Sequence, residues 1–147
     1  MKKKERVLFF CKHNSCRSQM AEAYLKKLAS DRFEVFSAGL FPEMIHPFVE
    51  VVMQEDGVSL RGQTAKSIDL YLGKQPLDHI IIVCQEGEAE CPRLYPFALH
   101  VERWPLPDPA SVQGDKETIL AAFRQTREAV KEHIKNWLKK KAEEQQA

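Results

Sequence analysis

The feature that most constrains this chain is a short stretch near its N-terminus, residues 7–18. It opens with Val7-Leu8-Phe9-Phe10, an apolar and β-prone run that predicts a buried strand. It closes at Ser18, a residue type that often caps helices, and residues 20–28 then have helical spacing. A loop between a strand and a helix N-terminus presents backbone N–H groups and the positive end of a helix dipole, which together favour a bound anion. We therefore call residues 11–18 the anion loop and expect Ser18 to be the N-cap.

Two side chains give the anion loop a chemical interpretation. Cys11 begins the loop and Arg17 lies six positions later. The field that holds an oxyanion also favours the thiolate form of a cysteine, which is its nucleophilic form. A guanidinium binds an oxyanion through two parallel hydrogen bonds. The spacing predicts a nucleophile within an oxyanion site, and the alternative is a buried structural cysteine followed by an incidental arginine.

The rest of the chain alternates predicted strands with predicted helices. We expect further strands at 33–38, 79–83 and 98–101, a helix beginning at His46 or Pro47 and ending near Asp56, a brief helix at 67–72, a long helix from 116 to about 141, and a frayed tail at 143–147. Prolines at 105, 107 and 109 exclude regular structure between the last strand and the last helix. This order predicts an α/β fold of three layers, a central four-stranded parallel sheet flanked by helices. The length of 147 residues suits a single domain, 1–147.

Composition excludes several partners. The net charge is +1, so no global charge bias favours a nucleic acid or a membrane surface. No apolar run approaches the roughly 20 residues of a membrane span. The lysines at positions 2–4 precede too short an apolar run for a signal peptide. We therefore expect a cytoplasmic protein, in a compartment that keeps thiols reduced.

A second pair of cysteines follows the predicted strand at 79–83. Cys84 and Cys91 flank a segment that holds a glycine, three glutamates and no large apolar residue, so we expect it to move. Because parallel strands end at one edge of a sheet, Cys11 and Cys84 are expected on the same edge. A zinc site of all four cysteines is disfavoured. Six residues lie between Cys84 and Cys91, whereas two to four residues typically lie between paired zinc ligands. A stable structural disulfide is disfavoured in the cytoplasm, which leaves redox chemistry or inert burial.

These motifs resemble a known family. Cys11, Arg17 and Ser18 after the first strand resemble the low-molecular-weight phosphotyrosine phosphatase superfamily, and residues 14–22 are more similar to its arsenate reductase branch. The segment from Cys84 to Cys91 and the following proline resembles the thioredoxin-coupled members of that branch. Asp108 in the proline-rich segment 104–110 matches the general acid of both branches. The resemblance implies a low-molecular-weight tyrosine phosphatase-like fold over nearly the whole chain.

The resemblance also implies a mechanism. Cys11 would attack arsenate, Asp108 would protonate the departing hydroxide, and Ser18 Oγ would hydrogen-bond the thiolate. Cys84 would then attack Cys11, Cys91 would attack Cys84, and thioredoxin would reduce the final disulfide. Phosphate or sulfate would bind as an analogue of arsenate, and no cofactor is expected. The oxyanion would be held by Lys12, His13, Asn14, Ser15, Cys16, Arg17 and Ser18. Cys16 has no chemical role in this scheme and is expected to be buried.

One position departs from the family pattern. Some of these reductases bind potassium through residues that match Asn14, Glu22, Ser37 and an aspartate, and the aspartate position is Lys66 here. An ammonium group that pairs with Glu22 would replace the cation, so we predict no metal. A solvated Lys66 is the alternative.

Three other functions stay open. The first is a tyrosine phosphatase that uses Cys11, Arg17 and Asp108 without redox chemistry. Against it, Gln19 stands where those phosphatases usually have proline, and Ala110 stands where they usually have an aromatic residue. The second is a reductase supplied by a small thiol, which would not need the additional cysteine pair. The third is a non-enzymatic module that senses an oxyanion or a partner protein.

Overall fold

The computed structural model describes residues 3–71, 73–74, 76–85 and 98–146. Its centre is a sheet of four strands in the order β2-β1-β3-β4, and every neighbouring pair is parallel. The strands are β1 (Glu5–Cys11), β2 (Phe33–Gly39), β3 (Leu77–Ile82) and β4 (Ala98–Arg103). The predicted parallel sheet is confirmed. β1 lies at its centre because its apolar run is buried on both faces.

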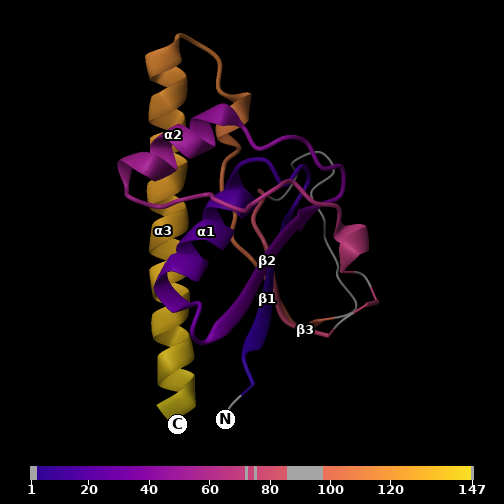
Figure 1. Ribbon diagram of the computed structural model, residues 1–147. Helices are drawn as coiled ribbons and strands as arrows, with labels where there is room; N and C mark the ends of the chain where they lie inside the picture. The colour runs from indigo at the N-terminus through magenta and orange to yellow at the C-terminus, as the bar shows by residue number, and fades with distance from the viewer. Residues whose placement is uncertain (1–2, 72, 75, 86–97, 147) are drawn as a thin grey trace.

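The long helices pack together against one face of the sheet (Figure 1). They are α1 (Arg17–Ala29), α2 (Pro47–Glu55) and α3 (Lys116–Gln146). Two short 3-10 helices, η1 (Ile68–Leu70) and η2 (Pro109–Ser111), complete the described elements. The predicted helix at 67–72 is thus only one short turn, and η2 begins within the proline-rich segment because proline suits a first helical position.

Two boundaries differ from the prediction. The N-cap of α1 is Cys16, without a side-chain hydrogen bond, so the expected cap at Ser18 is wrong. The hydroxyl of Ser18 is instead turned toward Cys11. The expected frayed tail is also wrong, since α3 continues to Gln146. Ala, Glu and Gln are good helix formers, so nothing local ends the helix after residue 141.

The core consists of two apolar clusters, one on each face of the sheet. Alternate residues of each strand point to opposite faces, so Phe9 belongs to the cluster under the helices while Phe10 belongs to the other. The helix-side cluster includes one apolar face of α3, namely Leu120, Phe123, Val130, Ile134 and Trp137. The second cluster is covered by the η1 segment through Ile68 and Tyr71.

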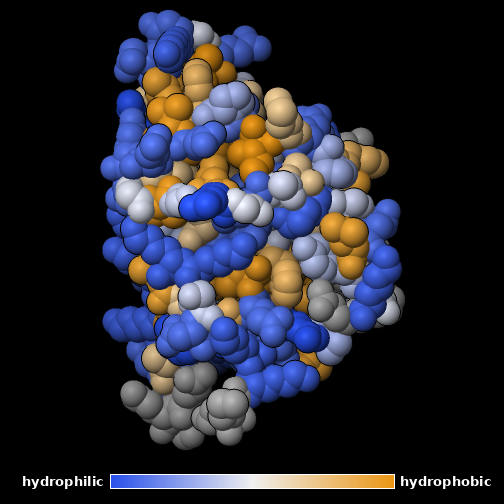
Figure 2. All heavy atoms as spheres, in the orientation of Figure 1, coloured by the Kyte–Doolittle hydropathy of each residue, from blue (hydrophilic) through white to orange (hydrophobic). Residues whose placement is uncertain are grey.

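The surface is mostly polar. On the face shown in Figure 2, hydrophobic residues appear as patches between hydrophilic ones. Within the described residues, no helix combines the length and apolarity that crossing a membrane requires.

Candidate active site

The site is built around the thiol of Cys11, the last residue of β1. Its Sγ accepts a hydrogen bond from the backbone N–H of Asn14 at 3.2 Å and lies 3.0 Å from Ser18 Oγ. Cys11 is a free and buried cysteine. The loop that carries these groups leads directly into the N-terminus of α1, as the sequence predicts.

The direction of the Ser18 hydrogen bond follows from its neighbours. Asn14 Nδ2 donates to Ser18 Oγ at 2.8 Å, which leaves the hydroxyl proton available for a hydrogen bond to Cys11. The Asn14 side chain is held in turn by the backbone N–H of Lys66, which donates to Asn14 Oδ1 at 2.9 Å. The Asn14 amide and the Ser18 hydroxyl therefore both face the sulfur of Cys11, on which a nucleophilic attack would depend.

The backbone of the anion loop is held from outside by residues 40–46, which we call the strap. The backbone N–H groups of the strap donate to carbonyl groups of the anion loop at 2.8–3.2 Å: Leu40 to Cys11, Phe41 to Lys12, Glu43 to His13 and His46 to Ser15. A peptide group directs its C=O and N–H in opposite directions. Carbonyls turned outward to the strap therefore leave amides turned inward, an arrangement that suits an anion.

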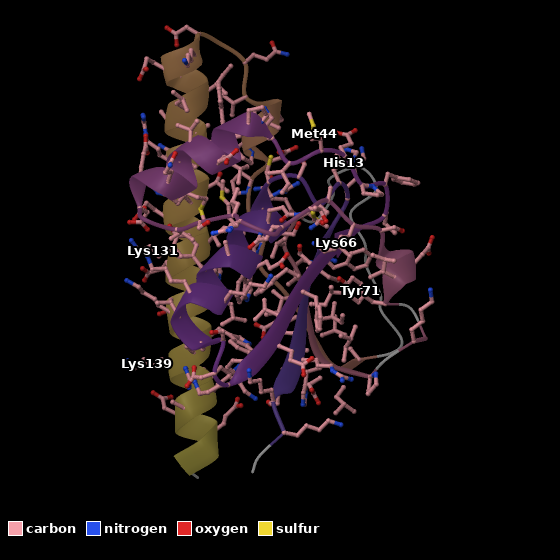
Figure 3. The ribbon with its side chains drawn as sticks, in the orientation of Figure 1. His13, Met44, Lys66, Tyr71, Lys131 and Lys139 are labelled. Carbon is pink, nitrogen blue, oxygen red and sulfur yellow. The ribbon has the colours of Figure 1, made fainter. Side chains whose placement is uncertain are left out.

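Two backbone features make this close approach of the strap and the anion loop feasible. A Cβ at Gly39 would lie 2.8 Å from Lys12 O and Asn14 N, so only glycine fits at the end of β2. Asn14 itself has φ +54°, a left-handed conformation that asparagine tolerates better than most residues. Figure 3 shows His13 of the anion loop and Met44 of the strap at the same end of the molecule, above the sheet.

Arg17 connects the anion loop to the segment that carries the predicted acid. Its Nη1 donates to the Leu106 carbonyl at 2.8 Å, and its Nη2 lies 4.0 Å from Asp108 Oδ2. Asp108 also accepts a hydrogen bond from the backbone N–H of Ala110 at 3.0 Å and so caps η2. The carboxyl group is fixed beside the guanidinium yet stays partly exposed, which suits a proton donor at the mouth of a site.

These groups surround a cavity of about 110 Å³. Its walls include Cys11, Cys16, Arg17, His46 and Asp108. The volume is far below the roughly 300–1,000 Å³ of pockets for drug-sized ligands. The cavity therefore suits a small anion, and the Cys11 thiol, the Arg17 guanidinium and the Asp108 carboxyl group all line it.

Gln19 fixes the anion loop from the helix side. It is fully buried, and its Nε2 donates to Asn14 Oδ1 at 2.8 Å and to the Thr64 carbonyl at 3.0 Å. Its Oε1 accepts from Gln63 Nε2 at 2.8 Å. A proline at this position would make none of these hydrogen bonds.

Lys66 occupies the position that the resemblance associates with a cation. Its ammonium nitrogen lies 3.5 Å from both Glu22 Oε1 and Ser37 Oγ, and 2.7 Å from the Thr64 carbonyl. Burial lowers the pKa of Lys66, although the facing Glu22 partly offsets that effect. The predicted pairing with Glu22 is confirmed. These residues do not suit potassium, because a positive charge already lies among them.

The two remaining cysteines of the described chain lie apart from each other. Cys16 is a buried free thiol, and burial raises its pKa to about 12, so it stays neutral beside Cys11. Cys84 lies just beyond β3 and is disulfide-bonded. Cys91, the expected partner in the relay, lies outside the described residues.

Cys11 and Cys84 do lie at the carboxyl edge of neighbouring strands, as expected. Their side chains, however, belong to different core clusters on opposite faces of the sheet. The register of β1 and β3 pairs Phe10 with Ile82, which sets Val83 beside Cys11 and turns Cys84 away. The edge was predictable from the strand order, but the face depends on a register that the sequence does not reveal.

Comparison with known proteins agrees with this geometry. Residues 6–147 match the family model described as low molecular weight phosphotyrosine protein phosphatase. The chain belongs to this family. The match covers every helix and every strand apart from the first residue of β1.

Several proteins to which the chain is similar carry reductase names. An arsenate reductase of Bacillus licheniformis is 35% identical over 136 residues, which cover 91% of this chain and 95% of the relative. A glutaredoxin arsenate reductase of Synechocystis sp. is also 35% identical over 136 residues, covering 92% and 98%. A solved arsenate reductase in a phosphate-binding state is 34% identical, with a TM-score of 0.77 and coverage of 92% and 98%.

The structure brings together most of the predicted residues of this family member. Cys11, Arg17, Ser18 and Asp108 meet around or directly behind the cavity. Two contributions were not foreseen: the backbone of the strap and the ring of His46. The sequence feature that could have indicated the strap is Gly39, because a glycine at the end of a strand often marks a place where another backbone segment approaches closely.

Proposed function

We propose that this chain is a cytoplasmic arsenate reductase, which converts arsenate to arsenite and passes the oxidation to thioredoxin. The observation that carries the proposal is the geometry at Cys11: a thiol with two aligned donors at the base of a cavity of oxyanion size. The names of relatives about one third identical favour arsenic chemistry on this family's scaffold. A cytoplasmic location follows from the need for a reducing thiol pool.

In the first step, Cys11 thiolate attacks the arsenic atom and forms a sulfur–arsenic bond. The inward amides of the anion loop and the Arg17 guanidinium hold the other oxygens of the oxyanion. Asp108 gives its proton to the departing hydroxide, which leaves as water. Asp108 lines the cavity beside Arg17, which places its carboxyl group near an anion bound there.

The second step moves electrons to arsenic. Cys84 thiolate attacks Cys11 Sγ, the sulfur–arsenic bond breaks, and its electron pair stays on arsenic, which leaves as arsenite. Cys91 then attacks Cys84 and releases Cys11 as a thiolate. A dithiol of thioredoxin reduces the resulting Cys84–Cys91 disulfide and restarts the cycle. The state in which Cys84 is disulfide-bonded while Cys11 is free supports this order of oxidation.

The relay requires Cys84 to change faces. In the structure Cys84 is fully buried in the cluster opposite Cys11. The first disulfide of the relay therefore requires the chain after β3 to turn at the sheet edge, so that Cys84 approaches Cys11. The two positions of Cys84 would be its reduced and oxidised arrangements.

Tyrosine phosphatase activity is the second candidate, and one observation favours it. The same three groups, Cys11, Arg17 and Asp108, are arranged as a hydrolase of phosphate monoesters needs them. Phosphate and arsenate have the same tetrahedral shape and charge. We propose that the chain retains weak phosphatase activity as a side reaction.

Two assays separate the candidates. The first follows NADPH consumption with arsenate in the presence of thioredoxin and its reductase. Glutaredoxin plus glutathione, and glutathione alone, serve as parallel donors, each with glutathione reductase. The second follows hydrolysis of p-nitrophenyl phosphate. We expect arsenate turnover to depend on thioredoxin and to exceed phosphatase turnover. Turnover with glutathione alone would overturn the thioredoxin assignment, and phosphatase turnover alone would overturn the reductase.

A matched pair of cysteine variants tests the relay. Cys84→Ser should keep phosphatase activity and lose arsenate reduction, because nothing displaces arsenic from Cys11. Cys91→Ser should stop after one turnover with a Cys11–Cys84 disulfide. Peptide mapping after one arsenate turnover without reductant identifies each disulfide. A Cys84→Ser protein that still cycles with thioredoxin would contradict the relay.

A further inference from the structure

His46 lies at a junction between α2 and the cavity. It is the N-cap of α2, and its ring Nδ1 accepts a hydrogen bond from the backbone N–H of Phe48 at 3.1 Å. Its own backbone N–H donates to the Ser15 carbonyl of the anion loop at 3.1 Å. His46 also lines the small cavity, together with Cys11 and Asp108. One residue thus contacts the helix start through its side chain, the anion loop through its backbone, and the cavity.

The helix cap determines which nitrogen of the ring carries the proton. An Nδ1 that accepts from Phe48 carries no hydrogen, so a neutral ring must carry it on Nε2. Burial lowers the pKa of His46, while the charge of Asp108 opposes that shift, so the neutral ring prevails at neutral pH. Nε2 is therefore a hydrogen-bond donor and not an acceptor.

Packing holds the ring in this orientation. The imidazole lies against Phe123, with ring centroids 4.6 Å apart, and against Phe48, with centroids 5.3 Å apart. Among the described residues, Nε2–H has no hydrogen-bond partner. A cavity of about 110 Å³ leaves a bound tetrahedral anion within reach of the groups that line it.

We propose that His46 is an additional anion-binding residue, whose neutral Nε2–H donates to an oxygen of the bound oxyanion. The inference rests on the proposed function in that it takes the cavity to be the oxyanion site. A neutral donor adds a hydrogen bond without changing the net charge of a cavity that already holds Arg17 and Asp108. It would favour an unesterified oxygen, an acceptor that arsenate and phosphate both offer.

Two substitutions separate the cap from the donor. Serine is a good N-cap, so His46→Ser keeps the start of α2 but is too short to reach the anion. His46→Ala loses both functions. We expect both variants to bind inorganic phosphate about tenfold more weakly than the wild type, because each loses the same hydrogen-bond donor. His46→Ser should have a higher melting temperature than His46→Ala, because serine keeps the helix cap.

The measurements are calorimetric titration with inorganic phosphate and nitrogen NMR of protein labelled with ¹⁵N-histidine. The wild type should show His46 protonated on Nε2 at neutral pH, with a shift of that signal when phosphate is added. Phosphate affinity of His46→Ser within twofold of the wild type, or an unmoved Nε2 signal, would overturn the inference. A wild type that binds no phosphate would instead refute the oxyanion site, so the two failures are distinguishable.

Discussion

Substitution of Lys66 by methionine should destabilise the protein, because it leaves Glu22 without its buried partner. The Glu22 side chain is 4% exposed, and the Lys66 side chain is 18% exposed. Breaking a buried ion pair from one side typically costs about 3–5 kcal/mol. Two features reduce that cost in this protein. Lys26 still pairs with the second oxygen of Glu22, and removal of Lys66 also removes the cost of burying its ammonium.

We therefore expect Lys66→Met to lower the free energy of unfolding by about 2 kcal/mol. For a chain of this size that corresponds to a fall in melting temperature of roughly 4–8 °C. The assay is urea unfolding followed by circular dichroism at neutral pH. The control is Lys26→Met, which removes the more exposed lysine from the same carboxylate and should cost no more than about 1 kcal/mol.

A double variant identifies the cause of the loss. If the unpaired carboxylate of Glu22 destabilises Lys66→Met, then adding Glu22→Gln should restore part of the lost stability, since a neutral amide costs less to bury. A single variant as stable as the wild type, or a double variant that loses the sum of both single changes, would refute the ion-pair reasoning. Potassium chloride and choline chloride at equal concentration should give the wild type the same melting temperature, because Lys66 already supplies the positive charge.

Four further predictions concern the site itself. Cys11→Ser should abolish arsenate reduction and phosphatase activity, since a hydroxyl does not replace a thiolate; residual turnover in either assay removes Cys11 from the mechanism. Asp108→Asn keeps the cap of η2 but loses the acid, and should slow both reactions by roughly 10²–10⁴-fold; an unchanged phosphatase rate would make it a turn residue only. Gly39→Ala should cost about 1–3 kcal/mol of stability and weaken phosphate binding, because the new methyl group meets the backbone of the anion loop. Burial lowers the pKa of His46, so the stability it contributes is complete above about pH 6.5 and is lost as the pH falls through its folded-state pKa. His46→Ser should reduce the loss of stability in acid, measured by unfolding at a series of pH values. The loss of stability that is due to His133, whose pKa is also lowered, should remain.

The fold and several of the residues that line the cavity were predictable because they depend on local sequence. The apolar run of β1 and the spacing of Cys11 and Arg17 determine a strand, a loop and a helix without help from distant residues. The apolar face of α3 follows from its helical period. Asp108 was identified by its match to the general acid of the family that the chain resembles, and the prolines on both sides of it indicated a fixed turn.

The rest depends on contacts between segments that are distant in sequence. Ser18 is a common N-cap residue type, but its hydroxyl forms hydrogen bonds with Asn14 and Cys11 and not with the helix backbone. The strap contacts the anion loop through backbone atoms, so the residue types of the strap do not predict these hydrogen bonds. Cys84 was assigned to the right edge but not to a face, since a shift of one residue in register reverses the face.

The strap has a consequence for how such a site diversifies. Its bonds to the anion loop come from backbone N–H groups, so they persist whatever side chains the strap carries. Phe41 and Met44 are largely exposed there, and Met44 lies at the cavity mouth. Mutation can therefore alter the entrance to the cavity while the anion cradle keeps its shape. Within residues 40–46, the backbone atoms maintain the shape of the anion loop, and the side chains are free to vary at the entrance to the cavity.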